Sequence, residues 1–95
     1  MKVLIIKLGA IGDVIRTTTI IHGLKSKYNG CRIDWVTKKE SFDILKNNDF
    51  IDEVYLIGKD SGKLKNKEYD LVISLDDDDE ACYLASTVNH KKLIG

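Results

Sequence analysis

The 95-residue sequence has no excess of charge of either sign, because fifteen Lys and Arg residues balance fifteen Asp and Glu residues. No field of one sign covers the whole protein, so we expect no general binding to nucleic acid. No apolar run approaches the roughly 20 residues of a membrane-spanning helix. Proline is absent, and we attach no function to its absence. What remains is an ordinary globular composition, 43% hydrophobic and 32% charged, which predicts a single domain.

Cysteine is scarce. The two cysteines, Cys31 and Cys82, match no metal-binding spacing. An apolar run follows Met1 and Lys2 directly, which leaves no room for a secretory signal. We therefore expect a cytoplasmic protein in which both thiols are reduced and structural.

Short apolar runs alternate with amphipathic stretches along the chain. We predict strands over residues 3–6, 32–37, 53–57 and 70–75, and the start of a fifth at 92–94. We predict helices over residues 13–28, 39–47 and 78–88, with Gly30 ending the first by a positive φ, and a polar loop or frayed helical turn over 58–67. This order predicts a three-layer α/β/α sandwich around a parallel sheet with strand order 3-2-1-4-5. The chain stops as the fifth strand begins, which suggests a fragment of a longer protein, although Gly95 as a true terminus stays open.

The segment after the first strand, Gly9-Ala10-Ile11-Gly12-Asp13, is the strongest candidate for a site. Ligands of open parallel sheets bind beyond the carboxyl ends of the strands, and glycines let the backbone approach a ligand closely. Two glycines at this spacing match neither the dinucleotide fingerprint nor the P-loop. Asp13 would also repel a phosphate at close range. Nucleotide binding by this turn is therefore a weaker hypothesis.

Asp13 itself has two interpretations. An ionised carboxylate at a helix amino terminus can accept a proton from a substrate hydroxyl. Aspartate is also a favoured N-cap residue, and the spacing alone favours the cap. Arg16, one turn into the predicted helix, either faces an anionic acceptor or is solvated.

The opening of the chain, Lys-Val-Leu-Ile-Ile-Lys-Leu-Gly-Ala-Ile-Gly-Asp-Val-Ile, resembles the amino terminus of glycosyltransferase family 9, the heptosyltransferases of lipopolysaccharide core assembly. The resemblance extends to about Asn29 and continues at residues 32–36, 52–54 and 69–73. It implies a Rossmann-like acceptor-side domain over residues 1–95, the amino-terminal half of a two-domain GT-B enzyme. Many heptosyltransferases carry serines where Gly9 and Ala10 stand, so those hydroxyl contacts are absent here.

The resemblance also implies a reaction. Such enzymes transfer a sugar with inversion from a nucleotide sugar, typically ADP-heptose, to a glycan or glycolipid acceptor, without a metal or a further cofactor. Asp13 matches the proposed general base, and Gly9, Ala10, Gly12 and Arg16 would contact the substrate. Because the acceptor can be a glycolipid, the resemblance is also compatible with a peripheral association of the enzyme with the inner face of the membrane. The alternative function is a non-catalytic Rossmann-like binding or interaction module.

The remaining polar features have simpler interpretations. The acidic run Asp76–Glu80 invites a metal hypothesis, but capping of the third helix by Asp77 or Asp78 is favoured. We interpret His22 in its helix and His90 in a lysine-rich turn as surface groups. Trp35 is assigned to the core. Lys59, Lys63, Lys65 and Lys67 form a basic stretch. Some heptosyltransferases carry a long basic insertion here that grips phosphorylated inner-core sugar; Lys63, Lys65 and Lys67 are either a remnant of it or, as we favour, a solvated loop.

Overall fold

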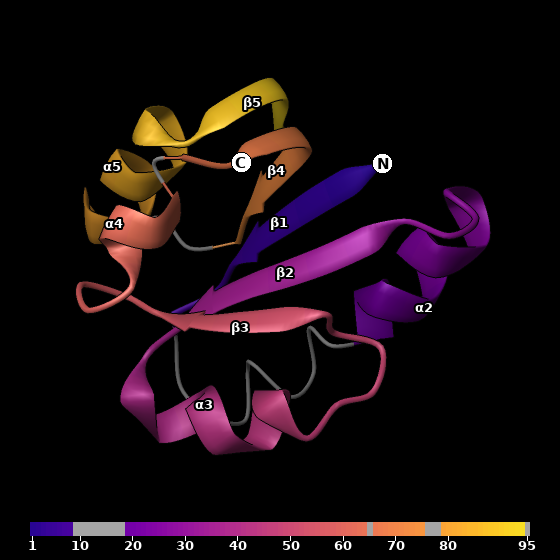
Figure 1. Cartoon of the computed structure of the whole chain (residues 1–95), viewed down its shortest axis with the longest axis horizontal. Coiled ribbons are helices and arrows are strands. Elements are labelled where there is room, and N and C mark those ends of the chain that lie inside the picture. The colour runs from indigo at the N-terminus through magenta and orange to yellow at the C-terminus, as the bar shows by residue number, and fades with distance from the viewer. Residues whose placement is uncertain (9–18, 65, 76–78, 95) are drawn as a thin grey trace.

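Five parallel strands form one sheet in the order β3-β2-β1-β4-β5, which confirms the predicted topology. The computed structural model describes residues 1–8, 19–64, 66–75 and 79–94 (Figure 1). The strands are β1 (Lys2–Ile6), β2 (Arg32–Thr37), β3 (Glu53–Leu56), β4 (Glu68–Ser74) and β5 (Asn89–Ile94). The helices are α2 (Thr19–Lys27), α3 (Lys39–Lys46), α4 (Ser61–Leu64) and α5 (Asp79–Thr87).

The helices cover both faces of the sheet, so the predicted three-layer architecture is also confirmed (Figure 1). Val3 and Ile5 of β1 pack in a cluster with residues of α2 and α3. Leu4 and Ile6 pack in a second cluster with residues of α4 and α5. All four side chains are fully buried, which explains why β1 is a continuous apolar run rather than an alternating one.

Local sequence accounts for the ends of the described helices. Gly30 has φ +77°, a conformation that L side chains rarely adopt, and it turns the chain from α2 into β2 as predicted. Helix α3 buries Ser41 and Leu45 on one face, and its C-cap residue is Asn47. The part of the first predicted helix before residue 19 lies outside the described residues.

Several elements differ by a residue from their predicted bounds, and the larger differences concern β5, β4 and the stretch after β3. Strand β5 begins at Asn89 rather than at Lys92, so His90 lies in a strand and not in a turn. All six residues of β5 are exposed at the edge of the sheet, where backbone pairing needs no apolar pattern. Strand β4 begins two residues before the predicted start, with Glu68 paired to Asn89. The polar stretch after β3 contains one helical turn, α4, which buries Leu64.

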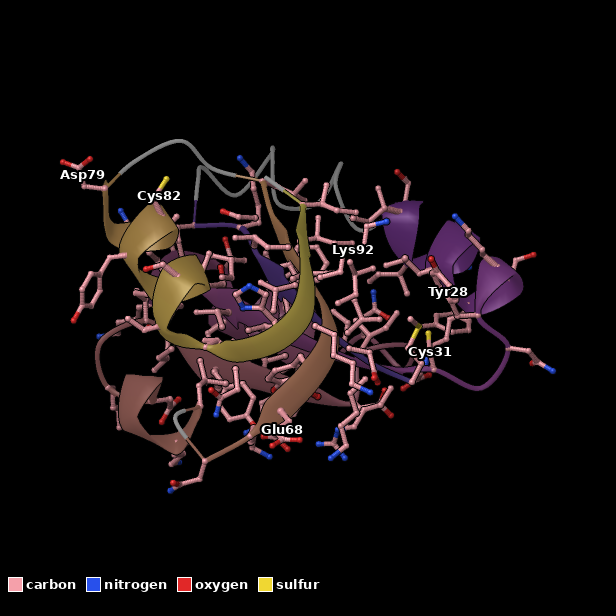
Figure 2. The ribbon with its side chains drawn as sticks, turned by 90° about the horizontal axis from the view of Figure 1, so that it is seen from above. Tyr28, Cys31, Glu68, Asp79, Cys82 and Lys92 are labelled. Atoms are coloured by element: carbon pink, nitrogen blue, oxygen red, sulfur yellow. The ribbon has the colours of Figure 1, made fainter. Side chains whose placement is uncertain are left out.

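Cys31 and Cys82 lie on opposite sides of the sheet and form no disulfide (Figure 2). Cys31 is buried in the core cluster of α2 and α3, as the structural interpretation requires. Cys82 is exposed on α5, so its assignment as a structural thiol was wrong. The period of α5 directs Ala81, Leu84 and Ala85 to the sheet and turns residue 82 to solvent.

Candidate functional site

The carboxyl ends of β1 and β4 meet at the point where the strand order reverses. Ile6 is paired with Ser74, and the Leu75 N–H donates a hydrogen bond of 2.9 Å to the Ile6 carbonyl. On the other side of β1, the Lys7 N–H donates to the Val36 carbonyl at 3.2 Å. Crevices at such switch points are where open α/β sheets bind their ligands.

The predicted site segment enters the fold at this position. Leu8 is 2% exposed and is the last described residue before it, and Thr19 is the first described residue after it. All five predicted site residues lie outside the described residues: Gly9, Ala10, Gly12, Asp13 and Arg16. The end of β1 and the start of α2 therefore fix the two ends of this segment, while the contacts of the Asp13 carboxylate stay a prediction.

The acidic run follows β4 at the same edge. Asp76, Asp77 and Asp78 lie outside the described residues, including both proposed caps. Asp79 is the first residue of α5 and is exposed, at the edge of the sheet opposite Glu68 (Figure 2). A negative charge at this amino-terminal position is stabilised by the helix dipole. Within residues 1–8, 19–64, 66–75 and 79–94, no group of three His, Cys, Asp or Glu residues could hold a metal ion.

The turns after β2 and β3 are basic. The Ile57 N–H donates to the Thr37 carbonyl at 3.0 Å, so these turns emerge side by side. Lys38 and Lys39 follow β2, and Lys59 follows β3; all three are exposed.

Two lysines of the predicted solvated loop contact other side chains. The Lys63 ammonium contacts the Asp60 carboxylate at 3.2 Å. The Lys67 ammonium lies 5.7 Å from the centre of the Tyr55 ring. Lys65 lies outside the described residues. The Lys63 side chain is 68% exposed, so it is solvated as predicted despite this ion pair, whereas Lys67 is partly buried.

A polar cluster of buried Asp34 and Tyr69 with exposed Arg32 lies near the amino ends of the strands, away from the candidate site. The Tyr69 hydroxyl donates a hydrogen bond of 2.6 Å to Asp34, whose other oxygen accepts one of 3.1 Å from Arg32. Burial, and then Asp34, raises the pKa of the Tyr69 hydroxyl, and Asp34 also raises the pKa of Arg32. Asp34 is 1% exposed. Sequence reasoning missed this cluster, although a single aspartate inside an apolar strand was its signal.

The same edge carries a groove of about 610 Å³ between the amino terminus, β4 and β5. Its central carboxylate, Asp70, accepts a hydrogen bond of 2.8 Å from the Lys2 N–H and lies 3.4 Å from the Lys91 ammonium. The Lys2 N–H, and then Lys91, lower the pKa of Asp70. Since both oxygens of Asp70 are engaged, we assign these contacts to folding.

Two further interpretations are tested by exposure. His22 is exposed as predicted, and its ring packs against Phe50 with 4.9 Å between ring centres. Trp35 is 0% exposed, which confirms its place in the core.

None of the helices in the described part of the chain is long and apolar enough to cross a membrane.

Comparison with known proteins confirms the resemblance predicted from the sequence. No family model matches the chain. Lipopolysaccharide heptosyltransferase 1 of Campylobacter coli is 33% identical over 57 residues, which are 60% of this chain and 17% of that protein.

Solved structures agree with this chain in fold. The E. coli heptosyltransferase WaaC with ADP matches with a TM-score of 0.85 and 23% identity, over 98% of this chain and 33% of that one. A glycosyltransferase of family 9 from Veillonella parvula matches with a TM-score of 0.86 and 20% identity, over 97% of this chain and 30% of that one. The chain thus spans 17% of the curated relative and about a third of the solved ones, and it has the α/β fold of heptosyltransferase-like proteins.

Proposed function

We propose that this heptosyltransferase-like chain is the acceptor-binding, amino-terminal domain of an inverting glycosyltransferase. The enzyme would transfer a sugar from a nucleotide sugar such as ADP-heptose to a lipopolysaccharide-type glycan acceptor in the cytoplasm. One structural observation carries the proposal: the segment that contains Asp13 connects β1 to α2 at the switch point beside β4. The sequence similarity to a curated heptosyltransferase supports it.

In the proposed reaction, the Asp13 carboxylate takes the proton of the acceptor hydroxyl. The hydroxyl oxygen bonds to the anomeric carbon as the bond from that carbon to the diphosphate breaks. The nucleoside diphosphate leaves with the electron pair, and the anomeric centre is inverted. This single displacement uses one general base and no protein nucleophile or metal. Gly9, Ala10 and Gly12 would let the backbone approach the acceptor, and Arg16 would contact it.

The donor is assigned to another part of the enzyme. Stabilising the departing diphosphate requires positive or hydrogen-bonding donors aimed at it. The E. coli relative has been solved with ADP and with ADP-2-deoxy-2-fluoro heptose, which supports a nucleotide-sugar co-substrate. Because this chain spans about a third of such relatives, we propose that residues 1–95 are one domain of a longer enzyme.

Sugar transfer by the complete protein tests this function. The complete protein should form product from ADP-heptose and an acceptor glycan, and the 95-residue chain alone should not. Asp13→Asn should lower the transfer rate by a factor of about 10² or more, because a general base is removed, and leave acceptor affinity nearly unchanged. Asp43→Asn, an exposed change on α3, is the matched control and should keep the activity. Acceptor binding without transfer in the complete protein would favour the non-catalytic binding module instead.

Titration with ADP tests the weaker nucleotide hypothesis on the chain alone. If the turn over residues 9–12 bound a nucleotide, Asp13→Asn would relieve charge repulsion and tighten the binding of ADP. We expect no such binding, because the donor is assigned elsewhere. Tight ADP binding by the 95-residue chain would contradict this division between the domains.

A further inference from the structure

The turn between α2 and β2 contains Asn29-Gly30, the one place in the sequence where a glycine follows an asparagine. Both residues are exposed. The Tyr28 carbonyl accepts a hydrogen bond of 2.9 Å from the Cys31 N–H, which closes a β-turn with Asn29 and Gly30 at its centre (Figure 2). Gly30 has φ +77° and the φ of Asn29 is not positive, which is the pattern of a type II turn. The turn therefore places this pair at the surface.

The nitrogen of Gly30 is unhindered and unbonded. A side chain at this residue would crowd the nitrogen from the carboxyl side, and glycine has none. A Cβ added to Gly30 would meet no atom within 4 Å, so no neighbouring segment crowds it either. Within the described part of the chain, neither the Gly30 N–H nor the Asn29 side chain forms a hydrogen bond. Folding therefore restrains neither of the two groups.

Two other asparagines are followed by an N–H that the fold already uses. The N–H after Asn47 donates a hydrogen bond of 3.0 Å to the Leu45 carbonyl. The N–H after Asn66 donates one of 3.1 Å to the Leu64 carbonyl. A reaction at either nitrogen would first have to break that hydrogen bond, and the residue that follows carries a side chain in both cases.

The remaining two asparagines are restrained in other ways. The Asn48 side-chain oxygen accepts a hydrogen bond of 2.9 Å from the Phe50 N–H. Asn89 lies in β5 and is paired with Glu68 of β4, so its main chain is held extended by the sheet. Asn29 is therefore the asparagine at which the side-chain amide and the next nitrogen are both free to react.

We propose that Asn29 is a site of spontaneous deamidation, a modification that requires only water and is independent of the proposed function. The Gly30 nitrogen loses its proton and bonds to Cγ of Asn29. The bond from Cγ to the amide nitrogen breaks, and ammonia leaves with that proton. Water then opens the resulting succinimide at one of its two carbonyl carbons. Opening at Cγ gives aspartate, and opening at the main-chain carbon gives isoaspartate; nothing is oxidised or reduced.

The two products affect the turn differently. Both add a negative charge just beyond the last turn of α2, which is the negative end of the helix dipole, although Lys25 and Lys27 of that turn offset part of this charge. Only isoaspartate routes the main chain through the former side chain. It lengthens the path from Tyr28 to Cys31 and so disrupts the hydrogen bond that closes the turn. The aspartate product keeps the turn intact.

Peptide mapping of the complete protein after incubation at mildly alkaline pH tests the proposal. The peptide that contains residue 29 should gain the mass difference between OH and NH2 before any other peptide from residues 1–95. It should separate by chromatography into an aspartyl and an isoaspartyl form. The rate should lie within about tenfold of that of a synthetic peptide of residues 26–33, because exposed turns open at little cost in free energy. Earlier reaction at another of these asparagines, or a folded rate below this range, would overturn the proposal.

Two variants and an unfolded sample serve as controls. Asn29→Gln should abolish the reaction, because glutamine must close a larger and slower-forming ring. Asn89→Gln, an exposed change on β5, should leave the rate at residue 29 within about twofold of the wild-type value, since distant sites act independently. In urea, the rates at Asn47 and Asn66 should rise as their local hydrogen bonds break, while the rate at Asn29 stays within about tenfold of its folded value. Equal rates at Asn47 and Asn66 in the folded and unfolded protein would refute the protection assigned to the fold.

Discussion

The Tyr69 hydroxyl of β4 donates a hydrogen bond of 2.6 Å to the Asp34 carboxylate of β2, across the intervening strand β1. Both side chains are at most 2% exposed. The bond therefore connects the two strands that flank β1, the strand from which the candidate site segment leaves the sheet.

Tyr69→Phe should destabilise the fold by about 1–3 kcal/mol, because it leaves a buried carboxylate oxygen without its donor. The measurement is the free energy of unfolding from urea titration. Tyr83→Phe is the matched control, since Tyr83 is 73% exposed, and it should change little. Equal stability of the two variants would mean that water or another group can replace the Tyr69 hydroxyl.

Acid should destabilise the protein partly through Asp60. The Leu56 N–H, followed by Lys63, holds the pKa of the Asp60 carboxyl below its usual value of 3.8. A carboxyl whose pKa is lower in the folded state adds stability above its unfolded pKa and loses that stability as the pH falls through the folded pKa. From about pH 5 to about pH 2, Asp60→Asn should lose less stability than the wild type.

Urea midpoints across that pH range measure this effect. Asp43→Asn is the matched control, because Asp43 is exposed and, within the described residues, forms no hydrogen bond or ion pair. It should follow the wild-type curve. If Asp60→Asn also followed it, Asp60 would not contribute to the acid sensitivity.

Thr37→Val should leave stability unchanged or raise it by up to about 1 kcal/mol. The Thr37 side chain is 0% exposed, and within the described residues its hydroxyl has no hydrogen-bond partner. Valine has the same shape and removes the uncompensated polar group. Thermal or urea unfolding measures the difference, and a clear loss of stability would show that the hydroxyl has a bound water as its partner.

The two thiols should differ in reactivity. Cys82 is exposed, whereas Cys31 is 2% exposed. A thiol-specific reagent such as Ellman's reagent should therefore modify Cys82 quickly in the folded chain and Cys31 only after unfolding. The variant Cys82→Ser should abolish the fast phase. Rapid modification of Cys31 in that variant would contradict its burial.

Much of the architecture follows from local patterns. β2 was predicted with its observed bounds, because its apolar side chains and the flanking Gly30 leave few alternatives. The edge strand β5 was predicted three residues too late, since its start depends on pairing with β4 and not on side-chain burial. The candidate site was predicted as a segment, and the structure places the end of β1 before this segment and the start of α2 after it. The Asp13 contacts stay a prediction.

The sequence alone determined the alternation of strands and helices, because buried strands require continuous apolar runs and helices require a period near 3.6. It also placed the segment that contains Asp13 after the first strand. Only the tertiary structure decided which charges meet. Arg32 and Asp34 are two positions apart, but Tyr69 reaches Asp34 from 35 residues away. Lys38 and Lys59 resemble any surface lysines until neighbouring strands bring their turns side by side. Contacts between distant residues depend on the register of the sheet, which no local pattern contains.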